Sequence, residues 1–439
     1  MRRRVVVSVI LAIALAARCA IVLDTPGYRP VNDSIHYLRL SESVAATGDY
    51  GSPPTAYHPP GYPYLLAGLQ LVAGREGTHA VAARLFQAAL GTLAVALIGL
   101  LAASLLGRRA GLLALAVAAV YLPLIELGDT LMSENLFVVL ELGALLAALR
   151  ARGSPHGLRW AALSGALTGL AALTRENGLL LILPLALCVW SARQRRSLAA
   201  LRAPALLVAA TLLVIAPWTL RNAIVMHSFI PISDETGMTL AGTYNAASAH
   251  DRRDPYTWRD LFRIPQDATL VREQSSVSET EFESRLQSAA IDYVGAHPLA
   301  IVAVAYWNTR RLLDLAGSFA TESAASNIGL PTGLARRGAE WFWLTAALAL
   351  AGLFAPATRR LPRWLWLAAG LLFASVVLVQ GETPRFRAPL DPFLIVLAAV
   401  GLDALVRRVA RPAATLAADA KQARPGDLPV PPPAPGQPG

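Results

Sequence analysis

Side chains that do acid–base chemistry and bind phosphate stand at the ends of apolar segments in this chain. Asp33, in the stretch VNDSIHY, follows the first long apolar run, and Glu134 opens a later one. A carboxylate at such a position can deprotonate or orient an attacking hydroxyl as a general base. Arginines hold similar positions, and the guanidinium fork matches the geometry of a phosphate. The combination suits a site where an acid works beside a bound phosphate.

The other candidates share a place at the external ends of the apolar segments in the topology derived below. They are Tyr37, His58, Tyr62, Arg175, Glu176, Arg221, Asn222, Arg385 and Arg387. Each has a purely structural interpretation as well: Glu134 can cap a helix, Arg221 can anchor at the lipid interface, and Arg175 can pair with Glu176. A site is favoured because acids from different loops and arginines from separate segments are expected on one face.

Composition identifies the elements that must position these residues. Of 439 residues, 55% are hydrophobic and only 15% are charged, whereas soluble domains carry about 25% charge. Apolar stretches of close to 20 residues recur, the length that a bilayer demands of a helix. Backbone groups in lipid must be satisfied within the segment, so helices are expected rather than strands. The sequence predicts an all-α polytopic membrane protein.

The net charge of +10 does not predict a nucleic-acid partner, because the arginine clusters lie between apolar runs. That distribution places the clusters in the cytoplasm by the positive-inside rule. It predicts about ten to eleven transmembrane helices in a cytoplasmic (inner) membrane, both termini cytoplasmic, and external loops 24–78 and 221–340. Residues 298–317 are short for a span and are expected to lie along the external surface. We expect the membrane domain to cover residues 1–409 and a Pro- and Ala-rich cytoplasmic tail, 410–439, to be disordered.

Six motifs in order resemble those of the GT-C glycosyltransferases, in particular bacterial glycosyltransferase 39- and 83-like proteins related to protein O-mannosyltransferases and to the aminoarabinose transferases of lipid A. The motifs are NDSIHYLRLSESVAATGDYG, YHPPGYPYLLA, MSENLF, LTRENGLLLILP, PWTLRNAIVMHSFIPIS and RFRAPLDPFLIVLAA. The resemblance implies a GT-C-type bundle with external juxtamembrane helices and a short external loop domain. It also implies transfer of a sugar from a polyprenyl-phosphate donor, with inversion, on the external face of the membrane.

By motif match, Asp33 takes the catalytic-acid position. Glu134 is expected to be a supporting acid near the acceptor or near an ion. Arg221, Arg385 and Arg175 are expected to hold the donor phosphate. Many relatives carry a second acid beside the first, but Asn32 and Ser34 flank Asp33 here. A divalent metal ion therefore stays an open possibility. The sugar and the acceptor (lipid, glycan or protein) are left open.

A transporter or lipid flippase is the main alternative function. Ionisable residues would then mark a translocation path. Transporters, however, carry such groups near the middle of the membrane and show inverted repeats. In this chain the acids are expected at one face, and we find no internal repeat. A non-catalytic scaffold would leave the convergence of acids and arginines unexplained.

Overall fold

The computed structural model describes residues 2–73, 79–190, 197–379 and 381–422, and within these ranges the chain is helical without strands. The α-helices are α1 (Arg2–Asp24), α2 (Asp33–Thr47), α3 (Gly61–Ala73), α4 (His79–Leu106), α5 (Arg108–Val120), α6 (Leu122–Asp129), α7 (Glu134–Gly153), α8 (Gly157–Thr174), α9 (Ile182–Val189), α10 (Arg202–Val225), α11 (Thr236–Thr243), α12 (Ala246–Ala249), α13 (Ala268–Glu273), α14 (Glu279–Ala296), α15 (Ala300–Leu312), α16 (Ser318–Asn327), α17 (Thr332–Leu353), α18 (Arg363–Val379) and α19 (Asp391–Gln422). Short 3-10 helices include η1 (Glu176–Leu181) and η8 (Pro384–Arg387).

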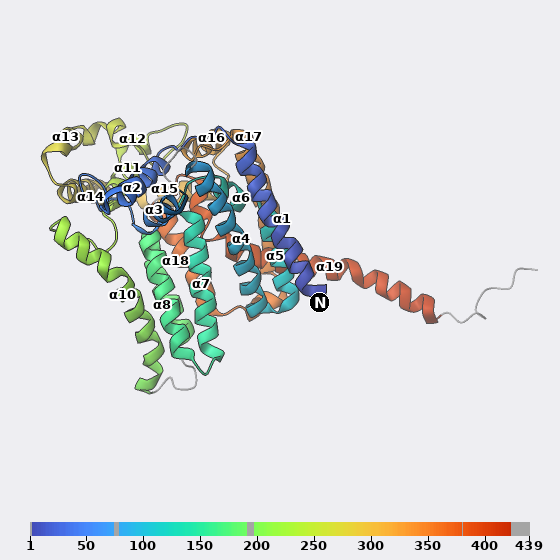
Figure 1. The fold of residues 1–439 in the computed structure, drawn as a ribbon. Helices are drawn as coiled ribbons and strands as arrows, with labels where there is room; N and C mark the ends of the chain where they lie inside the picture. Colours follow the sequence, from blue (N-terminus) through green and yellow to red (C-terminus); the bar gives the residue numbers. More distant parts are fainter. Residues whose placement is uncertain (1, 74–78, 191–196, 380, 423–439) are drawn as a thin grey trace, which may run out of the picture.

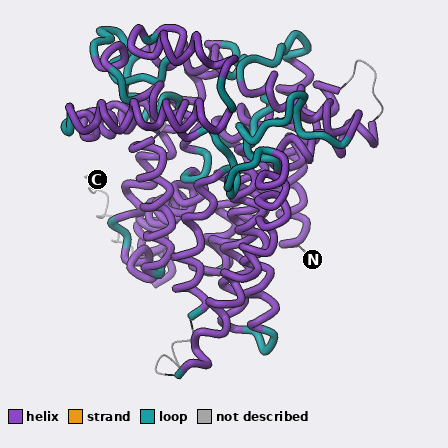
Figure 2. The backbone as a smooth tube through the Cα atoms, turned by 90° about the vertical axis from the view of Figure 1, so that its left-hand side faces the viewer, coloured by secondary structure: helices purple, strands orange, loops and turns teal. Residues whose placement is uncertain are grey.

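The long helices run side by side and form a bundle, and shorter helices cover one end of it. Helices α4, α7, α8 and α10 stand roughly parallel, with α7 against α8 and α8 against α10. Helices α2, α3 and α11 to α14 gather at the upper end (Figure 1). In the view turned by 90°, helices at that end lie across the bundle rather than along it (Figure 2). The all-helical membrane architecture predicted from the sequence is confirmed.

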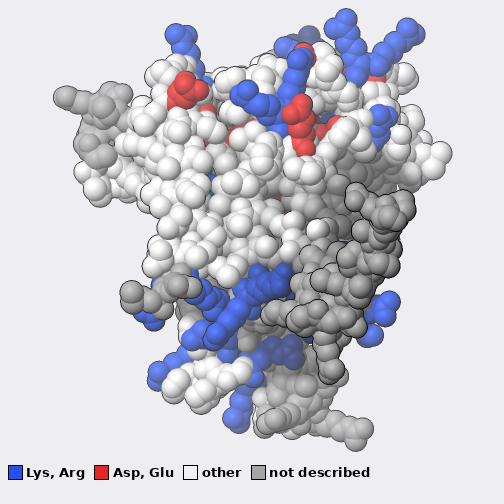
Figure 3. Space-filling model, turned by 90° about the vertical axis from the view of Figure 1, so that its right-hand side faces the viewer, with Lys and Arg blue, Asp and Glu red and all other residues white. Residues whose placement is uncertain are grey.

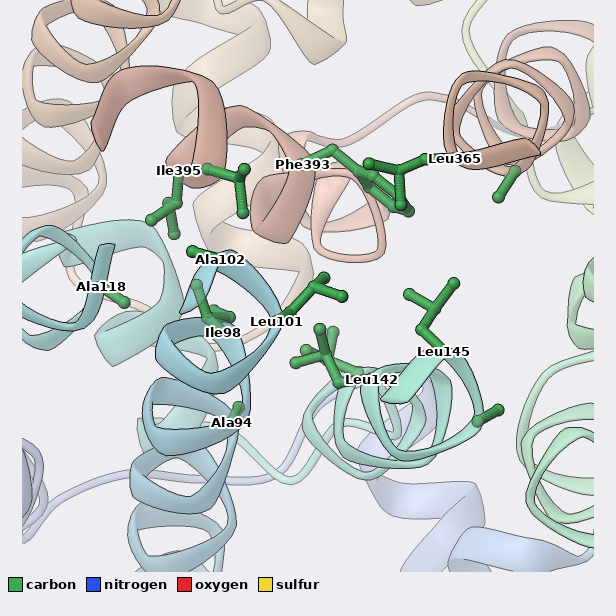
Figure 4. Packing of buried hydrophobic residues seen from close by; sticks show 14 of the residues in the cluster. Ala94, Ile98, Leu101, Ala102, Ala118, Leu142, Leu145, Leu365, Phe393 and Ile395 are labelled. Atoms are coloured by element: carbon green, nitrogen blue, oxygen red, sulfur yellow. The ribbon is translucent and has the colours of Figure 1, made fainter. Parts of the chain in front are cut away.

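The interior of the bundle is filled by small and branched apolar side chains. Ile98 and Leu101 of α4, Leu142 of α7 and Ile395 of α19 are each fully buried in one cluster (Figure 4). Helix α17 meets α19 at Gly352, where a Cβ would collide with the Leu397 carbonyl oxygen. Small residues at a helix contact let two backbones approach closely inside a membrane. This contact fixes the start of α19, which follows the η8 segment.

Three helices pass a length and hydropathy test for crossing a membrane: Arg3–Asp24, Ala80–Leu106 and Leu198–Val225. The number rises to five if two bent helix pairs among the described residues each count as one span. One of these pairs, α14 with α15, bends by 106°. On the face shown in Figure 3, uncharged side chains form a middle band, acidic and basic side chains both lie above it, and a belt of basic side chains lies below it. The predicted total of ten to eleven spans, and the surface position of 298–317, stay predictions.

Several boundaries differ from those expected. Helix α10 continues to Val225 and α17 starts at Thr332, so the loop predicted at 221–340 is helical at both ends. Helix α19 runs through Gln422, past residue 410 where disorder was expected; alanine-rich sequence after Pro412 has high helix propensity. The remainder of the predicted tail, 423–439, lies outside the described residues. Helix α14 is capped at its start, where Ser278 Oγ accepts from the Glu281 backbone N–H at 3.2 Å.

Candidate functional site

Asp33 is the first residue of α2, at the end of the bundle where the covering helices gather. The N-terminus of a helix carries partial positive charge from its unsatisfied N–H groups, which favours a carboxylate there. The preceding Asn32 turns the chain with a φ of 48° and donates from Nδ2 to the Asn327 carbonyl at 3.1 Å. The turn and this bond fix where α2 begins, and so where Asp33 lies.

An arginine from the far end of the sequence joins the two predicted acids. Arg385 Nη2 lies 2.6 Å from Asp33 Oδ2, and its Nε lies 3.7 Å from Glu134 Oε1. Arg175 Nη1 contacts the same Glu134 oxygen at 2.9 Å. Both guanidinium groups also lie over the ring of Phe386. The Cζ atoms of Arg385 and Arg175 are 4.6 Å and 5.1 Å from the centre of that ring. We call Asp33, Glu134, Arg175 and Arg385 the acid–arginine cluster.

Burial differs within the acid–arginine cluster in a way that bears on chemistry. The Asp33 side chain is 33% exposed, whereas those of Glu134 and Arg385 are 1% and 9% exposed. Burial alone raises the pKa of Asp33, but the positive charges of Arg385, His58 and Arg175 outweigh it and lower that pKa to about 2. Asp33 is therefore an ionised carboxylate that remains open to a substrate.

Three aromatic candidates pack beside Asp33. The Tyr37 ring centre lies 5.0 Å from that of His58 and 5.2 Å from that of Tyr62. All three are nearly buried, and the Tyr62 hydroxyl accepts a hydrogen bond from Gln87 at 2.9 Å. His58 is held on both sides, by Glu235 at its Nδ1 and by His36 at its Nε2, each at 3.2 Å. These side chains form one wall beside the acid–arginine cluster.

Arg221 and Asn222 contact backbone carbonyl groups rather than the acid–arginine cluster. Arg221 donates to the backbone carbonyls of Thr55 at 2.8 Å and Tyr50 at 3.2 Å, while the buried Asn222 donates to the Ile230 carbonyl at 3.0 Å. Both tie α10 to the loops around the site. Their part in binding donor phosphate stays a prediction.

Arg387 and Glu176 also lie apart from the contacts around Arg385. Arg387 is buried between Asp314 at 3.0 Å and Asp391 at 3.2 Å. Glu176 does not pair with Arg175 in the described contacts; it accepts from Ser233 Oγ at 2.5 Å and from the Ser233 N–H at 3.1 Å. Burial, with the charge of Glu235 nearby, raises the pKa of Glu176 to about 7.

Three residues were missing from the sequence-based selection: His36 and Glu235, which both contact His58, and the buried Glu126. His36 is one helical turn after Asp33, a spacing that places both on the same side of a helix. Glu126 had a clear signal, because an acid inside an apolar run is a functional candidate by default. Glu235 carries no sequence pattern that marks it as a candidate, because only the tertiary structure brings it into contact with His58.

The residues around Asp33 were tested as a metal site. Among the described residues, no group of three or more His, Cys, Asp or Glu side chains could hold a metal ion. The group that contacts both Asp33 and Glu134 is the Arg385 guanidinium, a cation, which cannot be a metal ligand. The side chains present do not fit a metal, and we derive no step through one.

Comparison with known proteins bears on the fold of the chain. The family described as dolichyl-phosphate-mannose-protein mannosyltransferase matches residues 57–220. The oligosaccharyltransferase of Archaeoglobus fulgidus in its apo form superposes with a TM-score of 0.55 at 15% identity, over 95% of this chain and 52% of that one. The chain has the GT-C fold. The chain spans about half the length of that relative, and the predicted resemblance in fold is confirmed.

Two further solved structures are similar to this chain. Archaeal AglB from Archaeoglobus fulgidus, in complex with an inhibitory peptide and a dolichol-phosphate, gives a TM-score of 0.52 at 13% identity, covering 95% of this chain and 52% of that one. ArnT from Cupriavidus metallidurans bound to undecaprenyl phosphate gives a TM-score of 0.44 at 17% identity, covering 97% of this chain and 82% of that one. No curated protein is significantly similar in sequence.

Proposed function

We propose that this chain transfers a sugar from a polyprenyl-phosphate donor to a hydroxyl of an acceptor at the external face of the cytoplasmic membrane. The observation that carries the proposal is Arg385, which contacts Asp33 at 2.6 Å and Glu134 at 3.7 Å. The matched family acts with a dolichyl-phosphate sugar by its description, and a protein of the same fold is known with a dolichol-phosphate. Both support a lipid-phosphate donor.

Arg385 and Arg175 are the groups we assign to the donor phosphate. Both are partly desolvated, and a guanidinium binds phosphate oxygens in pairs. In this structure each is engaged by an acid, Asp33 or Glu134. An arriving phosphate would compete for the same N–H groups. Binding of the donor is therefore coupled to release of Asp33 from Arg385.

Asp33 is the proposed catalytic base. With a pKa of about 2 it stays ionised at neutral pH but is a weak proton acceptor while Arg385 touches it. When Arg385 turns to the phosphate, Asp33 becomes more basic. The acceptor oxygen then bonds to the sugar's anomeric carbon and gives its proton to Asp33, while the bond from that carbon to the phosphate oxygen breaks. The electron pair stays on the phosphate, beside the arginines.

Charge at the opposite end of the bundle supports the proposed orientation. The belt of basic side chains in Figure 3 lies below the uncharged band, and the N-terminus of α1 lies at that lower end (Figure 1). Basic residues are retained on the cytoplasmic side. This supports an external position for the acid–arginine cluster, at the other end.

The test is donor consumption by the purified chain in lipid nanodiscs with a panel of polyprenyl-phosphate sugars. We expect at least one donor to be consumed by the natural sequence and not by Asp33→Asn. Glu322→Gln is the matched control, because Glu322 is an exposed acid paired with Arg336 on the surface. If no donor is consumed, or if Asp33→Asn consumes it normally, the proposal is wrong.

A further inference from the structure

Two histidines and a glutamate form a series of hydrogen bonds beside Asp33. Glu235 Oε2 lies 3.2 Å from Nδ1 of His58, and Nε2 of His58 lies 3.2 Å from Nδ1 of His36. The three side chains come from separate segments, because His36 is in α2, His58 precedes α3 and Glu235 precedes α11. His58 is 4% exposed, whereas His36 is an exposed residue. The series therefore ends in an imidazole that reaches solvent.

Glu235 sets the direction of these hydrogen bonds. An ionised carboxylate accepts hydrogen bonds and donates none, so Nδ1 of His58 carries a proton and donates it to Glu235. A neutral imidazole has one donor nitrogen and one acceptor nitrogen. Nε2 of His58 therefore accepts from Nδ1 of His36. The second nitrogen of a neutral His36, Nε2, is then the atom that can take up a proton.

His36 is also close to the proposed base. Asp33 and His36 are three residues apart in α2, and residues at this spacing have Cβ atoms about 5–6 Å apart on one side of a helix. Burial lowers the pKa of His36, and the charge of His58 lowers it further. The Asp33 carboxylate raises that pKa in part, against a smaller opposite effect of Arg39. A histidine with a lowered pKa is neutral at pH 7, so its Nε2 lone pair is available.

The proposed transfer leaves a proton on Asp33 in every turnover. This proton has to depart, because the pKa of Asp33 is about 2 when Arg385 is beside it. Bulk water at Asp33 would carry the proton away, but water at that place can also attack the anomeric carbon and hydrolyse the donor. A histidine that reaches Asp33 along α2 removes the proton without bringing bulk water to the reacting carbon.

We propose that His36 is a proton shuttle for Asp33, and that His58 and Glu235 are positioning residues that hold its ring. Nε2 of His36 takes the proton from Asp33, directly or through one water molecule, and the ring becomes an imidazolium. The series of hydrogen bonds to the Glu235 carboxylate stabilises this charge. His36 then releases the proton from Nε2 to solvent and is neutral again. The inference rests on the proposed function, because the proton comes from the acceptor hydroxyl.

The test is donor consumption at pH 7 by the purified full chain in nanodiscs, with imidazole added at increasing concentration. In His36→Ala, kcat should fall by roughly 10²-fold, the lower end for a positioned proton transfer. The donor KM should stay unchanged, because the phosphate is assigned to the arginines. Imidazole should restore kcat in His36→Ala and leave the natural sequence unaffected. A residue with a purely structural role would not be replaced by a small base in solution.

His250→Ala is the matched control. His250 is an exposed histidine at the end of α12, and its Nδ1 lies 2.7 Å from the Ala246 carbonyl oxygen of the same helix. This variant should show the kcat, the donor KM and the indifference to imidazole of the natural sequence.

Glu235→Gln and His58→Gln test the positioning residues. Each should lower kcat by less than His36→Ala does, leave the donor KM unchanged, and respond to imidazole. Thermal unfolding is measured for every variant. If His58→Gln does not fold, Glu235→Gln decides, because the Glu235 side chain is 30% exposed. Normal kcat in the folded His36→Ala variant, or a fall that imidazole does not restore, overturns the shuttle.

Nitrogen NMR of the histidine rings tests the arrangement without activity. We expect His58 to be protonated at Nδ1. The pKa of His36 should fall in Asp33→Asn, because the carboxylate that raises it is gone. An unchanged His36 titration in Asp33→Asn overturns the proposal. If the natural sequence consumes no donor, the transferase proposal fails; if consumption requires Asp33 but not His36, the shuttle alone fails.

Discussion

Replacing Arg385 by glutamine removes the positive charge 2.6 Å from Asp33 Oδ2 and 3.7 Å from Glu134 Oε1. Glu134 keeps Arg175 at 2.9 Å, whereas Asp33 loses the arginine that pairs with it among the described residues and stays partly desolvated. An arginine at such a distance lowers the pKa of an aspartate by about 1–3 units. From its value of about 2, the pKa of Asp33 should therefore rise to about 3–5 in Arg385→Gln.

This shift should appear in the pH dependence of kcat/KM for donor consumption, which reports ionisation in the free enzyme. Asp33 must be ionised to act as a base. In the natural sequence kcat/KM should stay level on the acid side down to about pH 4. In Arg385→Gln it should fall below about pH 5, and the donor KM should rise roughly 10- to 100-fold through loss of a charged hydrogen bond to phosphate.

The same ion pair affects stability with a definite sign. Because the folded pKa of Asp33 is lowered to about 2, its contribution is fully present above about pH 4, its unfolded value, and is lost as the pH falls through 2. Arg336→Gln, which removes an exposed arginine paired with Glu322, is the control. Identical pH profiles and identical donor KM values for Arg385→Gln and the natural sequence would refute this account.

Three other predictions follow from the same geometry. Asp33→Asn should fold normally and lose activity by roughly 10²–10⁴ in turnover, measured by donor consumption beside thermal unfolding; near-normal turnover would exclude Asp33 as the base. Arg387→Leu should destabilise the fold by about 3–5 kcal/mol, because it leaves two buried acids without their cation; a denaturant series that gives unchanged stability would contradict this. In a cysteine-free background, Ser288→Cys on α14 should react with an impermeant thiol reagent on intact cells, and Ser154→Cys only after permeabilisation; the reverse pattern would invert the orientation.

The sequence by itself determined the class of fold and the position of Glu134 at the start of its helix. A bilayer requires long apolar segments with internally bonded backbone, so composition and segment length were sufficient to predict a helical membrane protein. Glu134 begins a helix, as its place at the start of an apolar run predicts, whereas Asp33 was expected in an external loop and begins α2. The motifs that resemble GT-C proteins added the expected architecture, and the comparisons confirmed it.

Only the tertiary structure decided which arginine meets which acid. Arg385 and Arg387 are two residues apart in η8, and a 3-10 helix turns about 240° over two residues. One side chain therefore contacts Asp33, and the other enters the buried pair of Asp314 and Asp391. No local pattern contains this information, because both arginines occur in the same short motif. Pairing across hundreds of residues depends on how the helices pack, and packing is set by shape complementarity along whole helices rather than by any single segment.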